Sequence, residues 1–422
     1  MKKEQEIKYA KILNQELVEA TGCTEPIAIS YVASLAKKVL GKIPTEVIVS
    51  CSGNVIKNVK GVTVPNSGGK RGIEMAALLG IVGGNSDKCL SVLEDINEQH
   101  IEEATSLFQQ GICKVKLQQE VPNLYIDVVT KNENDEAEVE LQDSHQNITL
   151  IRHNAEIIKK VDKEVNKAEE EHPDLTIKGI LDYAENTDLK EVKEALERQI
   201  KDNCSIAKEG IDSRYGQQVG RTLLETYGDN SVNVRCRAYA AAGSDARMSG
   251  CPKPVVINSG SGNQGITVTM PVIEYAENLK VSHETLLRAL IISNLVSIHI
   301  KSYIESLSAF CGATSAAAGA GAAICWLLGG NYEQIGASIT NTLGTISGMV
   351  CDGAKSSCAG KISSAVETAL LSVSMAMKDR SYQEGEGLVS SDPEETIKAY
   401  GKMAKEGMKG TDVKIIQMMI EK

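Results

Sequence analysis

The amino-acid sequence predicts an α+β protein, with a large, mostly helical domain and a smaller α/β domain that carries an antiparallel sheet. Apolar residues recur at helical spacing over most of the 422 residues, whereas residues 113–153 contain four short strand-like runs separated by turn clusters. Aromatic residues make up only 4% of the chain, so the core must consist of Ala, Ile, Leu, Val and Met packed closely with 36 glycines. Such a core suits tightly packed helices.

Composition and charge exclude several classes of protein. A chain that is 42% hydrophobic and 24% charged is typical of a globular enzyme and not of a disordered protein. The net charge of -11 repels phosphate backbones and anionic lipid headgroups, so we expect no nucleic-acid or membrane partner. The N-terminus lacks the apolar segment of an export signal, and the eleven cysteines therefore indicate free thiols in a reducing cytoplasm.

The first two predicted helices meet at a cysteine. Apolar residues recur at helical spacing over residues 7–17, and Gly22 is well placed to end that helix. A second helix begins at once, because Thr24 can cap it and Glu25 complements its dipole. Cys23 then lies where the second helix would lower a thiol's pKa and hold an anion, which makes it a candidate base or nucleophile. A buried packing cysteine is the equal alternative.

The chain is predicted to divide into two domains. Residues 43–159 form the smaller α/β domain, and residues 1–42 together with 160–422 form the helical domain. After a β-branched run and two helices, four strand-like runs predict an antiparallel meander. These runs cover residues 113–119, 124–130, 136–142 and 147–153.

The C-terminal half is predicted to be mostly helical. Residues 159–203 are rich in Lys and Glu at helical spacing, which predicts exposed helices beside a boundary near His172 and Pro173. Beyond residue 212 the pattern is helical, with one short strand expected at residues 254–258.

Residues 306–351 carry a single formal charge, Glu333. A transmembrane pair could explain such a stretch, but it is rich in Gly, Ser, Thr and Asn and lacks basic flanks and aromatic belts. Small-residue helices let backbones approach closely. The stretch therefore predicts a dry, crowded protein centre, where electrostatic catalysis gains most.

Three cysteines flank this uncharged stretch: Cys311, Cys351 and Cys358. Three thiolates can hold a cluster or metal while one coordination position stays open, as a Lewis-acid catalyst requires. Their spacings of 40 and 7 residues match no general pattern, so three unrelated buried thiols are the alternative. The other cysteines are expected to pack in the interior: Cys51, Cys89, Cys113, Cys204, Cys236, Cys251 and Cys325.

Two glycine loops are rich in hydrogen-bond donors. Residues 258–265 contain G-x-G-x-x-G after a short strand, but no second strand ending in an acidic residue follows, which argues against a dinucleotide fold. The loop suits a small carboxylate instead. Residues 66–72 lack the Walker spacing and support an anion site or a turn. The candidate substrate-binding residues are Thr24, Asn66, Ser67, Ser259, Gly260, Ser261, Gly262, Asn263 and Gln264.

The six histidines are scattered, and no Ser/His/Asp order or pair of carboxylates emerges. His283 is expected near a helix start. His299 lies on an apolar face and is expected to be a core histidine with its hydrogen bonds satisfied.

Five segments together resemble the L-cysteine desulfidase family, which is related to the alpha chain of iron–sulfur L-serine dehydratases. The segments are ATGCTEP, VPNSGGKRG, INSGSGNQG, AFCGATSAAAGAGAA and CDGAKSSCAGK, in the family's order, and the resemblance runs to about residue 380. It implies an oxygen-sensitive 4Fe-4S cluster with one open iron, held here by Cys311, Cys351 and Cys358, and a reactive cysteine at Cys23. It further implies a catalytic helical domain that breaks L-cysteine down to hydrogen sulfide, ammonia and pyruvate without pyridoxal phosphate (PLP).

Two departures from the dehydratases favour the desulfidase branch. The dehydratases carry a hydroxyl-and-imidazole loop where this chain has TGCTEP, and their last two ligands are more widely spaced. An L-serine dehydratase and a non-catalytic, cluster-bearing amino-acid sensor are the alternatives. Large apolar helical cores of this kind favour a homodimer.

The resemblance agrees with the chemistry of β-elimination. The reaction must remove a weakly acidic Cα proton and expel sulfide, so it needs a base on one side and a Lewis acid on the other. Our hypothesis is that the open iron binds the substrate sulfur while the Cys23 thiolate takes the α-proton. The N-terminus of the second helix would hold the carboxylate together with Ser259, Ser261, Asn263 and Gln264.

Overall fold

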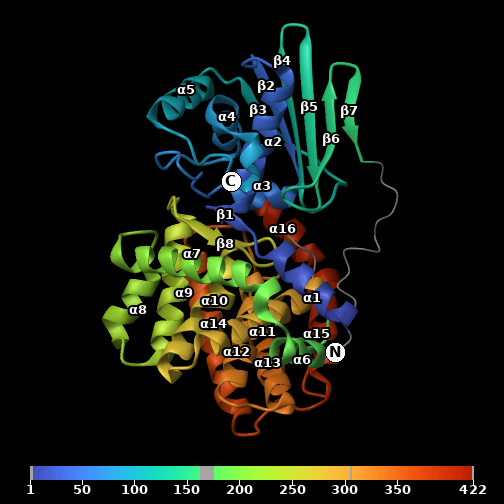
Figure 1. Cartoon of the computed structure of the whole chain (residues 1–422). Coiled ribbons are helices and arrows are strands. Elements are labelled where there is room, and N and C mark those ends of the chain that lie inside the picture. The colour runs from blue at the N-terminus through green and yellow to red at the C-terminus, as the bar shows by residue number, and fades with distance from the viewer. Residues whose placement is uncertain (1–2, 162–174, 305–306, 421–422) are drawn as a thin grey trace.

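A computed structural model describes residues 3–161, 175–304 and 307–420 of the chain. It has two lobes that lie one above the other in Figure 1. We call residues 24–160 the sheet lobe and residues 3–16, 175–304 and 307–408 the helical lobe. A mixed six-stranded sheet in the first and packed helices in the second confirm the predicted α+β class. The expected boundary near His172 and Pro173 falls outside the described residues.

The six strands of the sheet lobe have the order β3-β2-β4-β5-β6-β7. β2 lies between β3 and β4, parallel to the first and antiparallel to the second. The predicted meander is therefore wrong for its first run, because β2 separates that run from the others; β4 to β7 form a continuous antiparallel meander. The strands span Glu46–Cys51 (β2), Cys113–Leu117 (β3), Tyr125–Asn132 (β4), Asp135–Gln142 (β5), Ile148–His153 (β6) and Glu156–Lys160 (β7).

The helices of the sheet lobe pack on this sheet and on one another. They span Thr24–Leu40 (α2), Gly53–Val59 (α3), Ile73–Gly83 (α4), Ser86–Ser91 (η1) and Glu98–Gln109 (α5). α2 packs against α4, β4 and β5. A Cβ at Gly80 would lie 2.3 Å from the Ser30 carbonyl oxygen, so glycine permits α4 to approach α2. α2, which begins at the predicted reactive cysteine, is thus held firmly by the sheet lobe.

A short strand separates α1 from α2. α1 (Lys3–Glu16) is followed by β1 (Glu19–Thr21), which pairs antiparallel with β8 (Pro254–Val256) between the lobes. The expectation that Gly22 ends α1 is therefore wrong, because β1 intervenes. Gly22 instead has φ +68°, and a Cβ there would lie 2.0 Å from Pro65 Cγ. Cys23, and not Thr24, is the N-cap of α2.

The helical lobe contains the remaining helices, and β8 confirms the one short strand expected there. The helices span Ile177–Asn186 (α6), Leu189–Glu191 (η2), Lys193–Asp212 (α7), Val219–Tyr227 (α8), Val232–Met248 (α9), Gly262–Leu279 (α10), His283–Ser302 (α11), Gly312–Leu327 (α12), Tyr332–Ile346 (α13), Ser357–Ala376 (α14), Pro393–Lys402 (α15) and Met403–Gly407 (η3). The C-terminal helix α16 (Lys409–Ile420) lies between the lobes, against α3.

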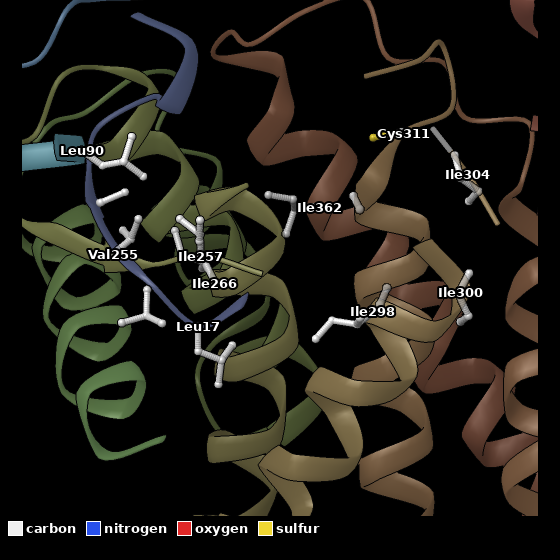
Figure 2. Packing of buried hydrophobic residues seen from close by; sticks show 14 of the residues in the cluster. Leu17, Leu90, Val255, Ile257, Ile266, Ile298, Ile300, Ile304, Cys311 and Ile362 are labelled. Carbon is white, nitrogen blue, oxygen red and sulfur yellow. The ribbon is translucent and has the colours of Figure 1, made fainter. Parts of the chain in front are cut away.

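The uncharged stretch forms the centre of the helical lobe. α12 packs against α10, α11, α13 and α14, and its residues 313–325 are all buried. A Cβ at Gly319 would lie 2.4 Å from the Ser293 carbonyl oxygen of α11, which confirms the close backbone approach that the small residues predict. Figure 2 shows Ile298 and Ile362 among the side chains of this core, with Cys311 at one end of it. No helix in the described part of the chain is long and apolar enough to cross a membrane.

Candidate active site

A cavity of about 1310 Å³ lies between the lobes and is lined by both. Three helices begin at it, α2, α10 and α12, with the N-cap residues Cys23, Ser261 and Cys311. None of these side chains caps a first-turn N–H group. Because helix N-termini carry partial positive charge and unpaired N–H groups, their convergence favours an anionic ligand.

The structure brings most of the predicted site residues together. Lining the cavity are Cys23, Ser259, Gly260, Ser261, Asn263, Gln264, Cys311, Cys351 and Cys358. Asn66 and Ser67 do not line it, because their side chains donate to the carbonyl oxygens of Leu93 (2.9 Å) and Lys70 (3.0 Å). Thr24 and Gly262 lie beneath the surface of the cavity, and the Thr24 hydroxyl donates to the Gly260 carbonyl oxygen (3.2 Å). Thr24 thus ties α2 to the loop before α10.

The three predicted ligand cysteines share one wall of the cavity. An antiparallel bridge between Phe310 and Val350 places Cys311 beside Cys351, although 40 residues separate them in the chain. Cys358 is the second residue of α14 and reaches the same wall. All three are free thiols. Tertiary contacts between segments that are far apart in the chain therefore bring Cys311 to the other two cysteines.

Three thiols that line one cavity are the donor type that an iron–sulfur cluster takes. Among the described residues, no three His, Cys, Asp or Glu side chains are spaced to hold one metal ion. In a four-iron cluster each cysteine binds a different iron, so the ligands lie farther apart. Burial and the neighbouring Cys351 raise the pKa of Cys311 to about 12, so a thiolate there needs positive charge nearby. The N-terminus of α12 supplies such charge, whereas Lys361, which also lines the cavity, is ion-paired with Asp352.

Cys23 forms a hydrogen-bonded pair with Glu25. The Cys23 Sγ donates to Glu25 Oε2 (3.2 Å), and Asn58 Nδ2 donates to Glu25 Oε1 (3.0 Å). The expected lowering of the thiol pKa is wrong: burial, and then the negative charge of Glu25, raise the pKa of Cys23 well above its ordinary value. The helix N-terminus does not outweigh these two effects, so the thiol keeps its proton in this arrangement.

Glu25 is a buried carboxylate that stays charged. It is 6% exposed, and burial alone would raise its pKa. The charge that His145 carries when it is protonated, the hydrogen bond from Cys23 and the charge of Arg247 outweigh burial and lower the pKa of Glu25; with a neutral His145 the last two remain. The cavity therefore contains a fixed negative charge beside the predicted base.

Arg247 provides a buried positive charge in the same cavity. It comes from α9 and is 2% exposed, and its Nε donates to the Gly22 carbonyl oxygen (2.9 Å). Within the described residues, its two terminal nitrogens have no hydrogen-bond partner and no carboxylate within 4.0 Å. A guanidinium anchored through one nitrogen leaves its remaining donors for a ligand carboxylate.

Four buried polar atoms at the cavity lack hydrogen-bond partners among the described residues. They are Asn58 Oδ1, His145 Nε2, Asn263 Oδ1 and Gln264 Oε1, and all four residues line the cavity. Because buried polar groups in folded proteins are nearly always paired, a concentration of unpaired ones indicates a bound ligand or ordered water. With Glu25 and Arg247, these atoms form a site suited to a small zwitterion.

The sequence analysis missed several of these residues. Residues 238–248 are rich in Ala and contain only two charges, Asp245 and Arg247, and this contrast is the one local signal that could have identified Arg247. Asn58 and His145 have no such signal. Of the other predictions, Cys325 is in the core as expected. His299 is buried and its Nε2 pairs with Glu394 Oε2 (2.7 Å), but its Nδ1 has no partner among the described residues, so the expectation that its hydrogen bonds are satisfied is only half correct.

A family model described as serine dehydratase alpha chain matches residues 87–417. The chain belongs to the serine dehydratase alpha chain family. Membership of this family indicates a lyase-type enzyme and confirms the relationship that the five segments predict. The match includes Arg247 and the three cavity cysteines Cys311, Cys351 and Cys358, whereas Cys23 and Glu25 precede it.

The chain is also similar over its whole length to proteins named UPF0597 protein. It is 48% identical to one from Lachnoclostridium phytofermentans, covering 98% of this chain and 99% of that relative. It is 46% identical to one from Finegoldia magna with the same coverage, and 44% identical to one from Treponema denticola over 98% of each chain. These relatives share both lobes, including the segment that precedes the family match.

Proposed function

We propose that this member of the serine dehydratase alpha chain family is an iron–sulfur-dependent L-cysteine desulfidase that acts without PLP. One observation carries the proposal: a single cavity is lined by three thiols on one wall, a further thiol at the start of α2, and a buried carboxylate and guanidinium. An α-amino acid has the opposite charges, an ammonium and a carboxylate. L-Cysteine adds a sulfur atom that prefers iron.

The amino acid is held by opposite charges. Arg247 binds the substrate carboxylate, together with the N-terminus of α10 and the polar groups of Ser259, Ser261, Asn263 and Gln264. Glu25, which stays anionic, binds the α-ammonium group. The Gly22 carbonyl oxygen holds Arg247 next to the residue that precedes Cys23, and Glu25 is hydrogen-bonded to the Cys23 thiol, so both charged groups lie close to the proposed base.

Cys311, Cys351 and Cys358 would hold the cluster. When bound, a four-iron, four-sulfur cluster with one iron free of cysteine supplies a Lewis acid for the leaving sulfur. The N-terminus of α12 offsets part of the negative charge of the three thiolates. The closely packed helices behind them exclude water from this wall.

Cys23 acts as the base. The charge of Arg247 opposes the raised pKa of Cys23, and a substrate ammonium group held by Glu25 favours the thiolate further. The thiol proton leaves to water, and the thiolate takes the α-proton of the substrate. The electron pair of the broken Cα–H bond forms the Cα=Cβ double bond, and the Cβ–S bond breaks with its pair leaving on sulfur. The released aminoacrylate tautomerises and hydrolyses to pyruvate and ammonia in water.

The proposal is tested with protein purified without oxygen. We expect bound iron and acid-labile sulfide, and release of sulfide and pyruvate from L-cysteine. Cys23→Ala should keep the iron and lose turnover by about 100-fold or more, because the base is missing. Cys204→Ala, at a half-buried thiol outside the cavity, is the matched control and should retain both. Iron-loaded wild-type protein that releases no sulfide would refute the desulfidase assignment.

Dehydration of L-serine is the second candidate, favoured by the name of the matching family. The same base and the same binding groups would serve it, with hydroxide leaving in place of sulfide. Parallel assays of pyruvate from L-serine and L-cysteine separate the two reactions. Turnover of L-serine alone would identify a dehydratase, and tight amino-acid binding with no turnover of either would identify a sensor.

A further inference from the structure

The turn between β5 and β6 carries an imidazole into the cavity. At its start Asp143 adopts φ +67°, and its N–H donates to the Leu124 carbonyl oxygen (3.0 Å). At its end Asn147 Nδ2 donates to the Gln142 carbonyl oxygen (3.0 Å). These bonds give the turn a fixed shape, so His145 at its tip has a rigid support.

His145 reaches across to the helical lobe. A Cβ at Gly260, in the loop before α10, would lie 3.4 Å from His145 Cε1, and Gly260 has φ +73°. Glycine therefore provides both the backbone shape of the loop and the room for the ring. The imidazole lies where the two lobes meet, against the loop that contributes Ser259 and Ser261 to the cavity.

One ring nitrogen of His145 lacks a partner. Nε2 is buried and makes no hydrogen bond within the described residues, although the residue lines the cavity. Burial lowers the pKa of His145, with Glu25 raising it and Arg247 lowering it further, so the net shift favours the neutral ring. A neutral imidazole with its proton on Nδ1 presents Nε2 as a hydrogen-bond acceptor.

We infer that His145 binds the α-amino group of the substrate and completes the amino-acid site from the sheet lobe, an inference that rests on the proposed function. The carboxylate already has donors in Arg247 and the N-terminus of α10. An ammonium group needs several acceptors, and Glu25 supplies only part of that need. The unpaired Nε2 beside Glu25 supplies a further acceptor, which explains why the turn inserts an imidazole between the lobes.

A pair of ligands that differ only in the amino group tests this role. L-Cysteine and 3-mercaptopropionate, which lacks the amino group, are titrated without oxygen into iron-loaded protein that carries Cys23→Ala, so that L-cysteine is bound but not consumed. Binding is measured by calorimetry, and the histidine variants are made in the same background. His145→Ala should weaken L-cysteine binding about tenfold or more and leave 3-mercaptopropionate binding within about twofold. His145→Gln, whose amide oxygen is an acceptor, should recover part of the loss.

The control is His153→Ala. His153 on β6 also has a buried, unpaired Nε2 but does not line the cavity, so this variant should bind both ligands as the Cys23→Ala protein does. Equal weakening of both ligands by His145→Ala, or no weakening of either, would overturn the inference about the amino group. Cys23→Ala protein that binds neither ligand would instead refute the proposed function, so the two failures are distinguishable.

Discussion

Three helices that begin at the cavity differ from five that begin elsewhere in how their first N–H groups are satisfied, although α4, α7 and α9 also begin away from the cavity without a side-chain cap. α5, α6, α11, α13 and α15 begin at Asn97, Thr176, Ser282, Asn331 and Asp392, and each side chain accepts a hydrogen bond from the first turn. α8 is capped by a residue of another helix, because Asp245 of α9 accepts a hydrogen bond from Val219 N (2.7 Å). By contrast, α2, α10 and α12 begin at Cys23, Ser261 and Cys311, which cap nothing.

Capped helix starts stabilise the fold, whereas uncapped starts at the cavity leave their N–H groups for a ligand. A capped helix satisfies its N-terminal N–H groups within the protein, which stabilises the fold by about 1 kcal/mol per cap. An uncapped helix at a cavity leaves the same groups for a ligand, at a cost to stability. Ser261 does not cap α10 although serine is a good capping residue, and neither does Ser231 at the start of α9. What distinguishes Ser261 is that it also lines the cavity.

The largest expected effect is loss of the cluster when a ligand at the cavity is removed. Cys351→Ala leaves two thiols on the ligand wall, so we expect anaerobically prepared variant protein to contain little or no iron. Bound iron and the visible absorption spectrum provide the measurement. A variant with full iron content would exclude Cys351 from the ligand set.

Removal of the buried guanidinium should have the next largest effect. Arg247→Gln removes the positive charge that faces the substrate carboxylate, and we expect kcat/KM for L-cysteine to fall about 100-fold. The iron content should not change, because Arg247 is not among the ligand cysteines. Steady-state kinetics on iron-matched samples measure the effect, and a loss below about threefold would contradict carboxylate binding by Arg247.

A carboxylate introduced at the start of α10 tests whether this uncapped helix N-terminus binds the substrate carboxylate. Ser261→Asp would cap α10 and put a negative charge where the substrate carboxylate binds, so KM should rise about tenfold while thermal stability is kept or increased. Ser282→Asp at the capped start of α11 is the matched control and should leave KM unchanged. If both variants behaved alike, the N-terminus of α10 would have no part in binding.

The smallest effect should follow removal of a cap away from the cavity. Asn331→Ala removes the capping box of α13 and should lower the free energy of unfolding by about 1 kcal/mol. Turnover of L-cysteine should be unaffected, since Asn331 does not line the cavity. Chemical denaturation and a standard assay measure both quantities. A large loss of activity would show that binding depends on caps remote from the site.

Local signals predicted the helices and much of the site. Apolar periodicity and the glycine loops were sufficient for α2, α4 and the helical centre, because each signal lies within the element it predicts. The parallel pairing of β2 with β3 was not predictable in this way, since their residues are far apart in the chain. A hydrogen bond to Gly22, 225 residues away, holds Arg247 at the cavity, and a turn of the other lobe carries His145 into it. Tertiary packing alone gives these two residues their place.

The raised thiol pKa of Cys23 has a related cause. The position of the cysteine at a helix start was predictable, but its burial and the adjacent negative charge were not. Glu25 lies two residues further on as a favourable first-turn residue, and only the folded structure turns its carboxylate back toward the thiol. A motif therefore located the group correctly, while its protonation state depended on the surroundings.

The bridge between Phe310 and Val350 has a consequence for the order of events during biosynthesis. It joins two ligand segments through backbone hydrogen bonds, and the helices on either side pack through apolar contacts that need no iron. Small zinc domains, whose few core residues cannot hold the ligands together, fold only with their metal. Here the polypeptide would fold first and receive its cluster afterwards through the open cavity. Oxygen or a chelator would then empty a folded protein, which could be refilled without refolding.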